Sequence, residues 1–194
     1  PATKDVPYQW IIRRLYMSRL NDTETPFLPA GGSLKLVELA PNVQHVQGGA
    51  ANNLIVAMKD HLVIFDAPFG EAQSRMVIDM AKAKYPGKPV KYLVLTHHHM
   101  DHAGGTRAYV AEGATIVVAA PTRAHFSRAL RRPRTVIADA QQTARKRLWI
   151  TEVKEKLTLK DELGEIRLYN IKNPHSDGHL IGHVVKDNIV YVTD

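Results

Sequence analysis

Four potential metal ligands lie within six consecutive residues of this chain, namely His97, His99, Asp101 and His102. Side chains two residues apart in an extended segment project to the same side, so His97 and His99 can bind one ion. Asp101 and His102 follow and can reach a second ion nearby. Imidazole and carboxylate ligands suit zinc, with iron or manganese as alternatives, and need no thiolate. The competing interpretation is a surface histidine cluster or a tag-like tract, but a tag would not lie between a strand and a Gly-Gly turn.

The segments around these ligands indicate how they are positioned. Residues 90–95 form a short apolar run rich in β-formers, which predicts a buried strand that ends just before the histidines. Gly104 and Gly105 predict a tight turn after them, and Thr106 is expected to cap a helix that begins at Arg107. A strand end, a sharp loop and a helix start therefore hold the four ligands.

The rest of the chain alternates between strand and helix patterns. Strands are expected over residues 36–39, 43–46, 53–58, 62–65 and 115–119, with a hairpin at Lys59-Asp60, and helices over 71–85 and from Pro121 to about Leu130. This order predicts parallel βαβ units behind an antiparallel first sheet. Residues 149–153, 157–159 and 166–171 predict strands of a second sheet. Residues 1–33 are expected to be a leader or linker, followed by one domain over 34–194.

The pattern His97-x-His99-x-Asp101-His102, after an apolar strand and before two glycines, resembles the signature of the metallo-β-lactamase superfamily. The resemblance covers about residues 34–194. It implies an α+β fold, the family's αβ/βα sandwich, present as its N-terminal half and part of the second sheet. Family members continue past the position of Asp194 to a final metal-binding histidine, so a missing C-terminal segment, or a complementary chain, is expected to complete the domain.

The same resemblance assigns roles to residues far from the motif. His175, in the turn-rich loop over 173–179, is expected to complete the first metal site, and Asp194 to bridge the two metals. His179 stands where the family places a variable or supporting residue, and it could also simply pack or cap. Asp66, at the end of a predicted strand, either orients a ligand or is a turn-forming residue before Ala67-Pro68.

What the resemblance implies for function is a metal-dependent hydrolase, with two zinc ions expected in the intact domain. A metal-activated hydroxide would attack an ester, thioester, lactone or β-lactam-type small molecule, while Asp101 orients it and shuttles its proton. Two alternatives remain open. One is a phosphodiesterase or nuclease that uses the basic segment 123–147, and the other is a non-catalytic metal-binding protein. For the basic segment, a solvated insert is favoured over a binding surface.

Composition limits the remaining choices. The chain has 194 residues, of which 44% are hydrophobic and 23% charged, as in an ordinary globular protein. No apolar run approaches the ~20 residues of a membrane-spanning helix, so no membrane span is expected. The chain contains no cysteine, which removes thiolate ligands but leaves the compartment open between the cytoplasm and a periplasmic or secreted location. The formal net charge of +7 either favours anionic substrates or aids solubility, and solubility is the preferred interpretation.

Overall fold

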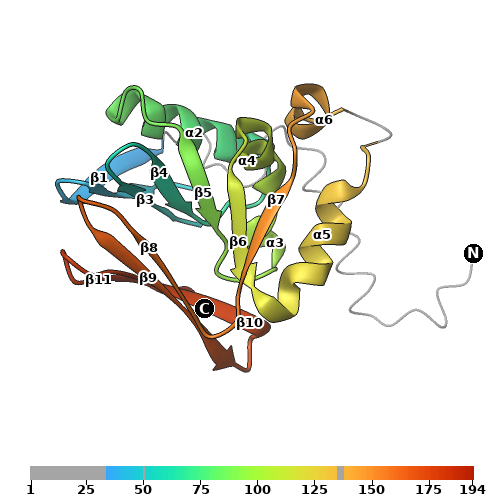
Figure 1. Cartoon of the computed structure of the whole chain (residues 1–194). Helices are drawn as coiled ribbons and strands as arrows, with labels where there is room; N and C mark the ends of the chain where they lie inside the picture. Colours follow the sequence, from blue (N-terminus) through green and yellow to red (C-terminus); the bar gives the residue numbers. More distant parts are fainter. Residues whose placement is uncertain (1–33, 50, 135–137) are drawn as a thin grey trace, which may run out of the picture.

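The computed structural model describes residues 34–49, 51–134 and 138–194. Two β-sheets face each other, and helices cover the outer face of the larger one (Figure 1). This arrangement confirms the predicted α+β class and the αβ sandwich. The expected leader or linker over 1–33 lies outside the described residues. No described helix is both long and apolar enough to cross a membrane.

The large sheet has seven strands, which lie side by side in the order of the sequence. They are β1 (Lys35–Ala40), β2 (Val43–Gln47), β3 (Asn53–Ala57), β4 (Leu62–Phe65), β5 (Val90–Val94), β6 (Thr115–Ala119) and β7 (Trp149–Val153). The small sheet has the order β11-β10-β9-β8, with β8 (Lys156–Lys160), β9 (Glu165–Asn173), β10 (Ser176–Val184) and β11 (Ile189–Tyr191). The helical segments are α2 (Glu71–Lys84), α3 (Met100–Ala103), α4 (Thr106–Glu112), η1 (Ala120–Thr122), α5 (Arg123–Arg131) and α6 (Ala140–Ala144).

The connections of the large sheet change from hairpins to crossovers along the chain. Strands β1 to β4 pair antiparallel, and the expected Lys59-Asp60 turn joins β3 to β4. Strands β4 to β7 pair parallel, which requires a crossover before each new strand. The crossovers contain α2, then α3 and α4, then α5 and α6. The carboxyl ends of β4, β5 and β6 therefore lie at one edge of the sheet, and the metal-ligand motif follows β5 there.

Two local predictions are wrong. Trp149–Val153 was predicted in the second sheet, but it pairs parallel with β6 as the last strand of the large sheet. Thr106 does not cap α4 but is its first residue, and its hydroxyl donates to the carbonyl of Ala103. The helix expected from Pro121 to about Leu130 is confirmed as α5, which begins at Arg123 after a 3-10 turn that contains Pro121. The insert over 123–147 contains α5 and α6, and α5 buries Phe126 against the core.

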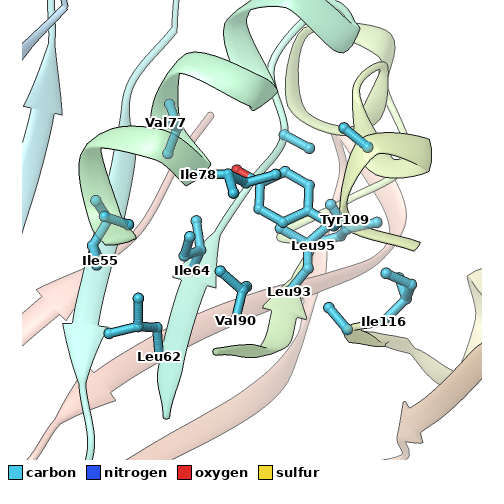
Figure 2. Close-up of a cluster of buried hydrophobic side chains, with 14 of the residues drawn as sticks. Ile55, Leu62, Ile64, Val77, Ile78, Val90, Leu93, Leu95, Tyr109 and Ile116 are labelled. Carbon is cyan, nitrogen blue, oxygen red and sulfur yellow. The ribbon is translucent and has the colours of Figure 1, made fainter. Parts of the chain in front are cut away.

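Strand β4 is buried along its whole length, which explains why it appears as a continuous apolar run, and β5 is buried at Val90, Leu93 and Val94. On one face, α2 and α4 place Val77, Ile78 and Tyr109 over Ile64 and Leu93 (Figure 2). The helices must cover this face because both strands present apolar side chains to it.

The opposite face of the large sheet packs on the small sheet. Phe65 and Val94 contribute to this second cluster from the large sheet, and Ile166, Leu168 and Leu180 contribute from the small one. A Cβ atom on Gly182 of β10 would collide with the ring of Phe65, so a glycine is needed for the close approach of the two sheets. This packing brings β10 and β11 to the edge where β4 and β5 end.

Candidate metal centre

The ligand motif is a short loop held tightly against the start of α2. His97 follows β5, α3 begins after His99, and α4 begins after Gly105. A Cβ atom on Gly104 would collide with the carbonyl of Phe69, and one on Gly105 with the side chain of Ser74. Both glycines have negative φ angles, so their role here is close backbone approach and not a left-handed turn.

Three imidazoles from two distant segments converge. His175 Nε2 lies 2.9 Å from His99 Nδ1 and 3.2 Å from His97 Nε2. Two nitrogen ligands of a tetrahedral zinc ion, each about 2.0–2.1 Å from the metal, lie roughly 3.3 Å apart. The three nitrogens therefore already have about the spacing that a single ion requires. His175 reaches this position from the connection between β9 and β10, which is tighter than the predicted loop because β10 begins at Ser176.

A second group shares His97 with the first and adds Asp101 and His102. His102 Nε2 lies 3.7 Å from an oxygen of Asp101. Asp194 lies between the two groups, because its Oδ2 is 3.0 Å from His102 Nε2, 3.6 Å from His175 Nε2 and 3.7 Å from His97 Nε2. The structure thus brings together all six ligands predicted from the sequence, and one carboxylate oxygen of Asp194 faces both groups.

Asp66 is fully buried beneath this centre and has a φ angle of 61°, which is uncommon for a residue other than glycine. Its carboxylate accepts hydrogen bonds from the backbone N–H of Thr96 at 2.8 Å, the Thr96 hydroxyl at 3.0 Å and the Tyr191 hydroxyl at 3.2 Å. Its Oδ2 is also 2.8 Å from His102 Nδ1. Of the two sequence interpretations, these contacts support the ligand-orienting one over a simple turn residue.

The hydrogen bonds behind the rings determine which nitrogens face the centre. Asp66 accepts from Nδ1 of His102, which leaves Nε2 free to face Asp194. Thr96 Oγ1 donates to Asp66, so it can accept from Nδ1 of His97 at 3.2 Å, and the Nε2 of His97 is left for an ion. Both tautomers suit metal binding.

The electrostatics of the two anchored histidines differ. Burial lowers the pKa of His97 to about 3, and the neighbouring imidazoles add to this effect, so His97 is neutral at physiological pH. Burial also acts to lower the pKa of His102, but the hydrogen bond and charge of Asp66, with Asp101 and Asp194, raise it overall. His97 is thus ready to bind a cation, whereas His102 must lose a proton to do so when it is charged.

His179 is more closely associated with the centre than the sequence indicated. It is fully buried, and its ring stacks on that of His97 with centroids 5.1 Å apart and an interplanar angle of 15°. Neither of its ring nitrogens has a hydrogen-bond partner among the described residues. Unsatisfied buried imidazole nitrogens beside converging ligands are what a metal-free form of a metal site presents, so the donor set fits one or two divalent ions. His183, further along β10, pairs with Asn188 and lies outside this cluster.

A cavity of about 480 Å³ opens beside the second group. Asp101, His102 and Asp194 line its polar side. Its apolar side includes Val190 and Val192, which are both more than half exposed. A small molecule that enters this cavity has an apolar wall to contact and a polar centre to react with.

The chain combines an αβ sandwich with histidine and carboxylate side chains at the carboxyl ends of parallel strands. This combination is that of a metal-dependent hydrolase fold. The model of the metallo-beta-lactamase superfamily matches residues 46–194, so the chain belongs to that superfamily. Solved structures share the fold at low sequence identity. A metallo-beta-lactamase from Pontibacter korlensis has a TM-score of 0.62 at 17% identity and covers 81% of this chain and 70% of its own. A diflavin flavoprotein fragment from Nostoc has a TM-score of 0.64 at 15% identity, covering 84% and 66%.

Sequence relatives are similar over a shorter region. A linear primary-alkylsulfatase from Pseudomonas is 33% identical over 78 residues, which are 40% of this chain and 12% of the relative. An alkyl/aryl-sulfatase from Saccharomyces cerevisiae is 31% identical over the same length, with the same shares. The matched segment is thus about an eighth of the length of these relatives.

Proposed function

We propose that this chain forms the metal-binding part of a hydrolase with two metal ions, most simply zinc. His97, His99 and His175 would hold one ion, Asp101 and His102 the other, and Asp194 would bridge them. The observation that carries the proposal is the convergence of three imidazole nitrogens on one point, with Asp194 Oδ2 within 3.7 Å of both groups. Supporting it, the chain belongs to a superfamily with a metal-dependent hydrolase fold.

The chain's own residues account for the remaining chemistry. An ion held by these residues would lower the pKa of a water molecule bound to it and would polarise the substrate oxygen. Asp66 and Thr96 hold His102 and His97 in the tautomers that direct Nε2 toward the centre. The half-exposed carboxylate of Asp101 is placed to orient a water molecule and to accept or return its proton. The apolar side of the cavity, near Val190, offers an apolar part of a substrate a surface to contact.

His179 is a competing candidate for the third imidazole of the first ion. It lies beside His97 and is buried, whereas His175 is exposed. Against it, the three nitrogens that approach one another most closely include that of His175. Single alanine variants of the two histidines separate the alternatives, because loss of the true ligand lowers metal content and loss of a packing residue lowers stability first.

The proposed substrates are esters, thioesters, lactones and β-lactams, which all present an electrophilic carbonyl. Alkyl sulfate esters form a second candidate class, because the sequence relatives are named alkylsulfatases and match 78 residues of this chain. Phosphodiester hydrolysis remains the alternative within the same fold. A protein that binds metal without turnover is the non-catalytic alternative.

The test measures metal per chain by elemental analysis, together with turnover of carboxylic ester, β-lactam, alkyl sulfate and phosphodiester probes, on the complete natural protein. We expect bound metal, loss of turnover on chelation and recovery on readdition. Asp101→Asn is expected to keep at least the first ion and to lose most of the turnover. Metal without turnover on any probe would contradict the hydrolase proposal, and no bound metal would contradict the centre itself.

A further inference from the structure

One side of α5 carries a basic groove of about 420 Å³, which we call the α5 groove. Its lining residues are His125, Arg128, Ala129, Arg132, Pro133 and Arg134. Half of them are arginines and none is acidic, so the groove presents concentrated positive charge. The sequence alone favoured a solvated insert here, because charge runs usually have no partner. A groove with arginines on its walls indicates a more specific role.

Little of this charge is neutralised within the protein. Arg128 and Arg132 form no ion pair with any described residue. Arg134 lies 3.5 Å from Asp139, but that carboxylate is already paired with the guanidinium of Arg107. Arginine stays charged at every physiological pH, and its planar donors match the oxygens of phosphate, sulfate or carboxylate. The groove is therefore complementary to an oxyanion.

The backbone of the groove is anchored to α4, the helix that follows residues 97–105, which carry the proposed ligands and which we call the metal loop. Arg107 of α4 is buried, and its Nη1 donates to two backbone carbonyls, including that of Arg132 at 3.1 Å. Its Nη2 donates to Asp139 at 3.0 Å, which ties α6 to α4. Gln142 of α6 accepts from the backbone N–H of Arg134 at 2.8 Å. These bonds hold the arginine-bearing segment in one place relative to the metal loop.

One end of the α5 groove, at His125, lies near the metal centre. β5 and β6 are parallel neighbours, so the metal loop and the start of α5 leave the sheet at the same edge (Figure 1). His125, in the first half of α5, contacts His98 with ring centroids 5.5 Å apart. His98 in turn lies 4.8 Å from His99, one of the proposed ligands. Two successive ring contacts therefore connect the groove to the centre.

We propose that the α5 groove binds an anionic group of the substrate, such as a phosphate, sulfate or carboxylate, at a distance from the bond that is hydrolysed. The inference rests on the proposed function and adds the substrate class, a small molecule with a remote negative charge. Nucleic acid fits less well, because no aromatic side chain other than the imidazole of His125 lines the groove for bases to stack on.

The first test measures binding and needs no turnover. Inorganic phosphate and sulfate are titrated into the complete protein after metal removal, by calorimetry at low and high salt. Arg128→Gln with Arg132→Gln is compared with Lys35→Gln with Lys154→Gln, which changes the net charge equally outside the groove. Both pairs are exposed, so folding is expected to be unchanged. We expect anion binding to weaken roughly tenfold in the double arginine variant and not in the double lysine variant. We also expect binding to be weaker at high salt. Equal binding in both pairs would overturn the proposal.

The second test measures selectivity with the metal-loaded protein. Two esters with the same leaving group are compared, one carrying a remote carboxylate or phosphate and one neutral. The arginine pair is expected to raise KM for the anionic ester roughly tenfold, leaving kcat and the neutral ester unchanged. An equal effect on both esters would refute the groove as a substrate subsite. A single-stranded RNA oligomer serves as a further probe. If it bound far more tightly than phosphate, and if the double arginine variant lost this affinity, the groove would be a nucleic-acid site and the proposal would fail.

The two tests also separate this inference from the function on which it rests. Absence of turnover with every probe would remove the proposed hydrolase and with it the substrate role of the groove. Loss of phosphate binding confined to the arginine pair would, in the same experiment, still establish the α5 groove as an anion site.

Discussion

Replacement of Asp66 by alanine tests whether the buried carboxylate orients the metal ligands. Asp66 receives hydrogen bonds from Thr96, His102 and Tyr191, and all of these donors are buried. The substitution leaves the Thr96 N–H and the His102 Nδ1–H without that acceptor, whereas the Tyr191 hydroxyl can still donate to the carbonyl of Asn52 at 2.9 Å. It also places alanine at a φ angle of 61°, which alanine adopts at a cost.

The size of the effect follows from these contacts. Each buried donor that loses its acceptor costs about 1–3 kcal/mol, and neighbouring losses are not additive. We therefore expect Asp66→Ala to lower the free energy of unfolding by about 3–5 kcal/mol, a large part of the 5–15 kcal/mol typical of a domain. Because His102 also loses the group that fixes its tautomer, metal affinity is expected to fall about 10- to 100-fold.

The assay combines urea unfolding of the metal-free protein with chelator competition for metal affinity, so that metal binding does not enter the measured stability. Asp66→Asn, which keeps the size of the side chain, provides a milder variant that is more certain to fold. Asp139→Ala is the matched control, because it removes another paired carboxylate, that of α6, without contact to the centre. If Asp66→Ala changed stability by less than about 1 kcal/mol, or if both aspartates changed metal affinity equally, the orienting role would be refuted.

Three further predictions concern other groups. His175→Ala is expected to lower bound metal with little loss of apo stability, whereas equal metal content in His175→Ala and wild type, with loss in His179→Ala, would transfer the ligand role to His179. The hydrogen bond from Arg107 lowers the pKa of Asp139, so this pair stabilises the fold above the unfolded pKa of Asp and loses its effect as pH falls through the lowered value. Asp139→Asn should therefore lower the free energy of unfolding by about 1–3 kcal/mol near pH 7 and by less in acid. Urea unfolding curves at several pH values would measure this. The carboxylates around His102 raise its pKa, so protons compete with the second ion for this imidazole. The affinity for the second ion should therefore fall as the pH drops, and a competition titration at several pH values would measure it.

Much of the fold follows from local patterns in the sequence. Residues 62–65 and 90–94 are short runs rich in apolar β-formers, and both form strands. The first is buried throughout, whereas Lys91 of the second is exposed. The helix predicted over 71–85 exists over Glu71–Lys84, because its apolar residues recur at helical spacing and Gly87 follows. The motif histidines lie at a strand end, as expected. These features depend on neighbours in the sequence, which is why a sequence pattern can predict them.

Features that depend on distant contacts were missed or left open. The sequence of residues 149–153 fits a half-buried strand in either sheet. Only the parallel pairing with β6, a contact between distant residues, assigns this strand to the large sheet. Tyr191 gave no signal, since its role comes from a hydrogen bond to Asp66, 125 residues away in the chain. The sequence offered one signal for His179, its spacing of four residues from His175 in a turn-rich segment. Its burial and its stacking on His97 depend on the folded structure and could not be predicted from that spacing.

The topology of the large sheet explains why so many of these groups meet. β4, β5 and β6 end at one edge, so the carboxylate of Asp66, the metal loop and the start of α5 must lie there together. The small sheet then supplies His175 and Asp194 from the opposite side. An ion bound at this centre would therefore connect the two sheets as well as supply chemistry. Metal binding would for this reason be coupled to sheet packing, and a variant that loosens the contact between the sheets is expected to weaken both.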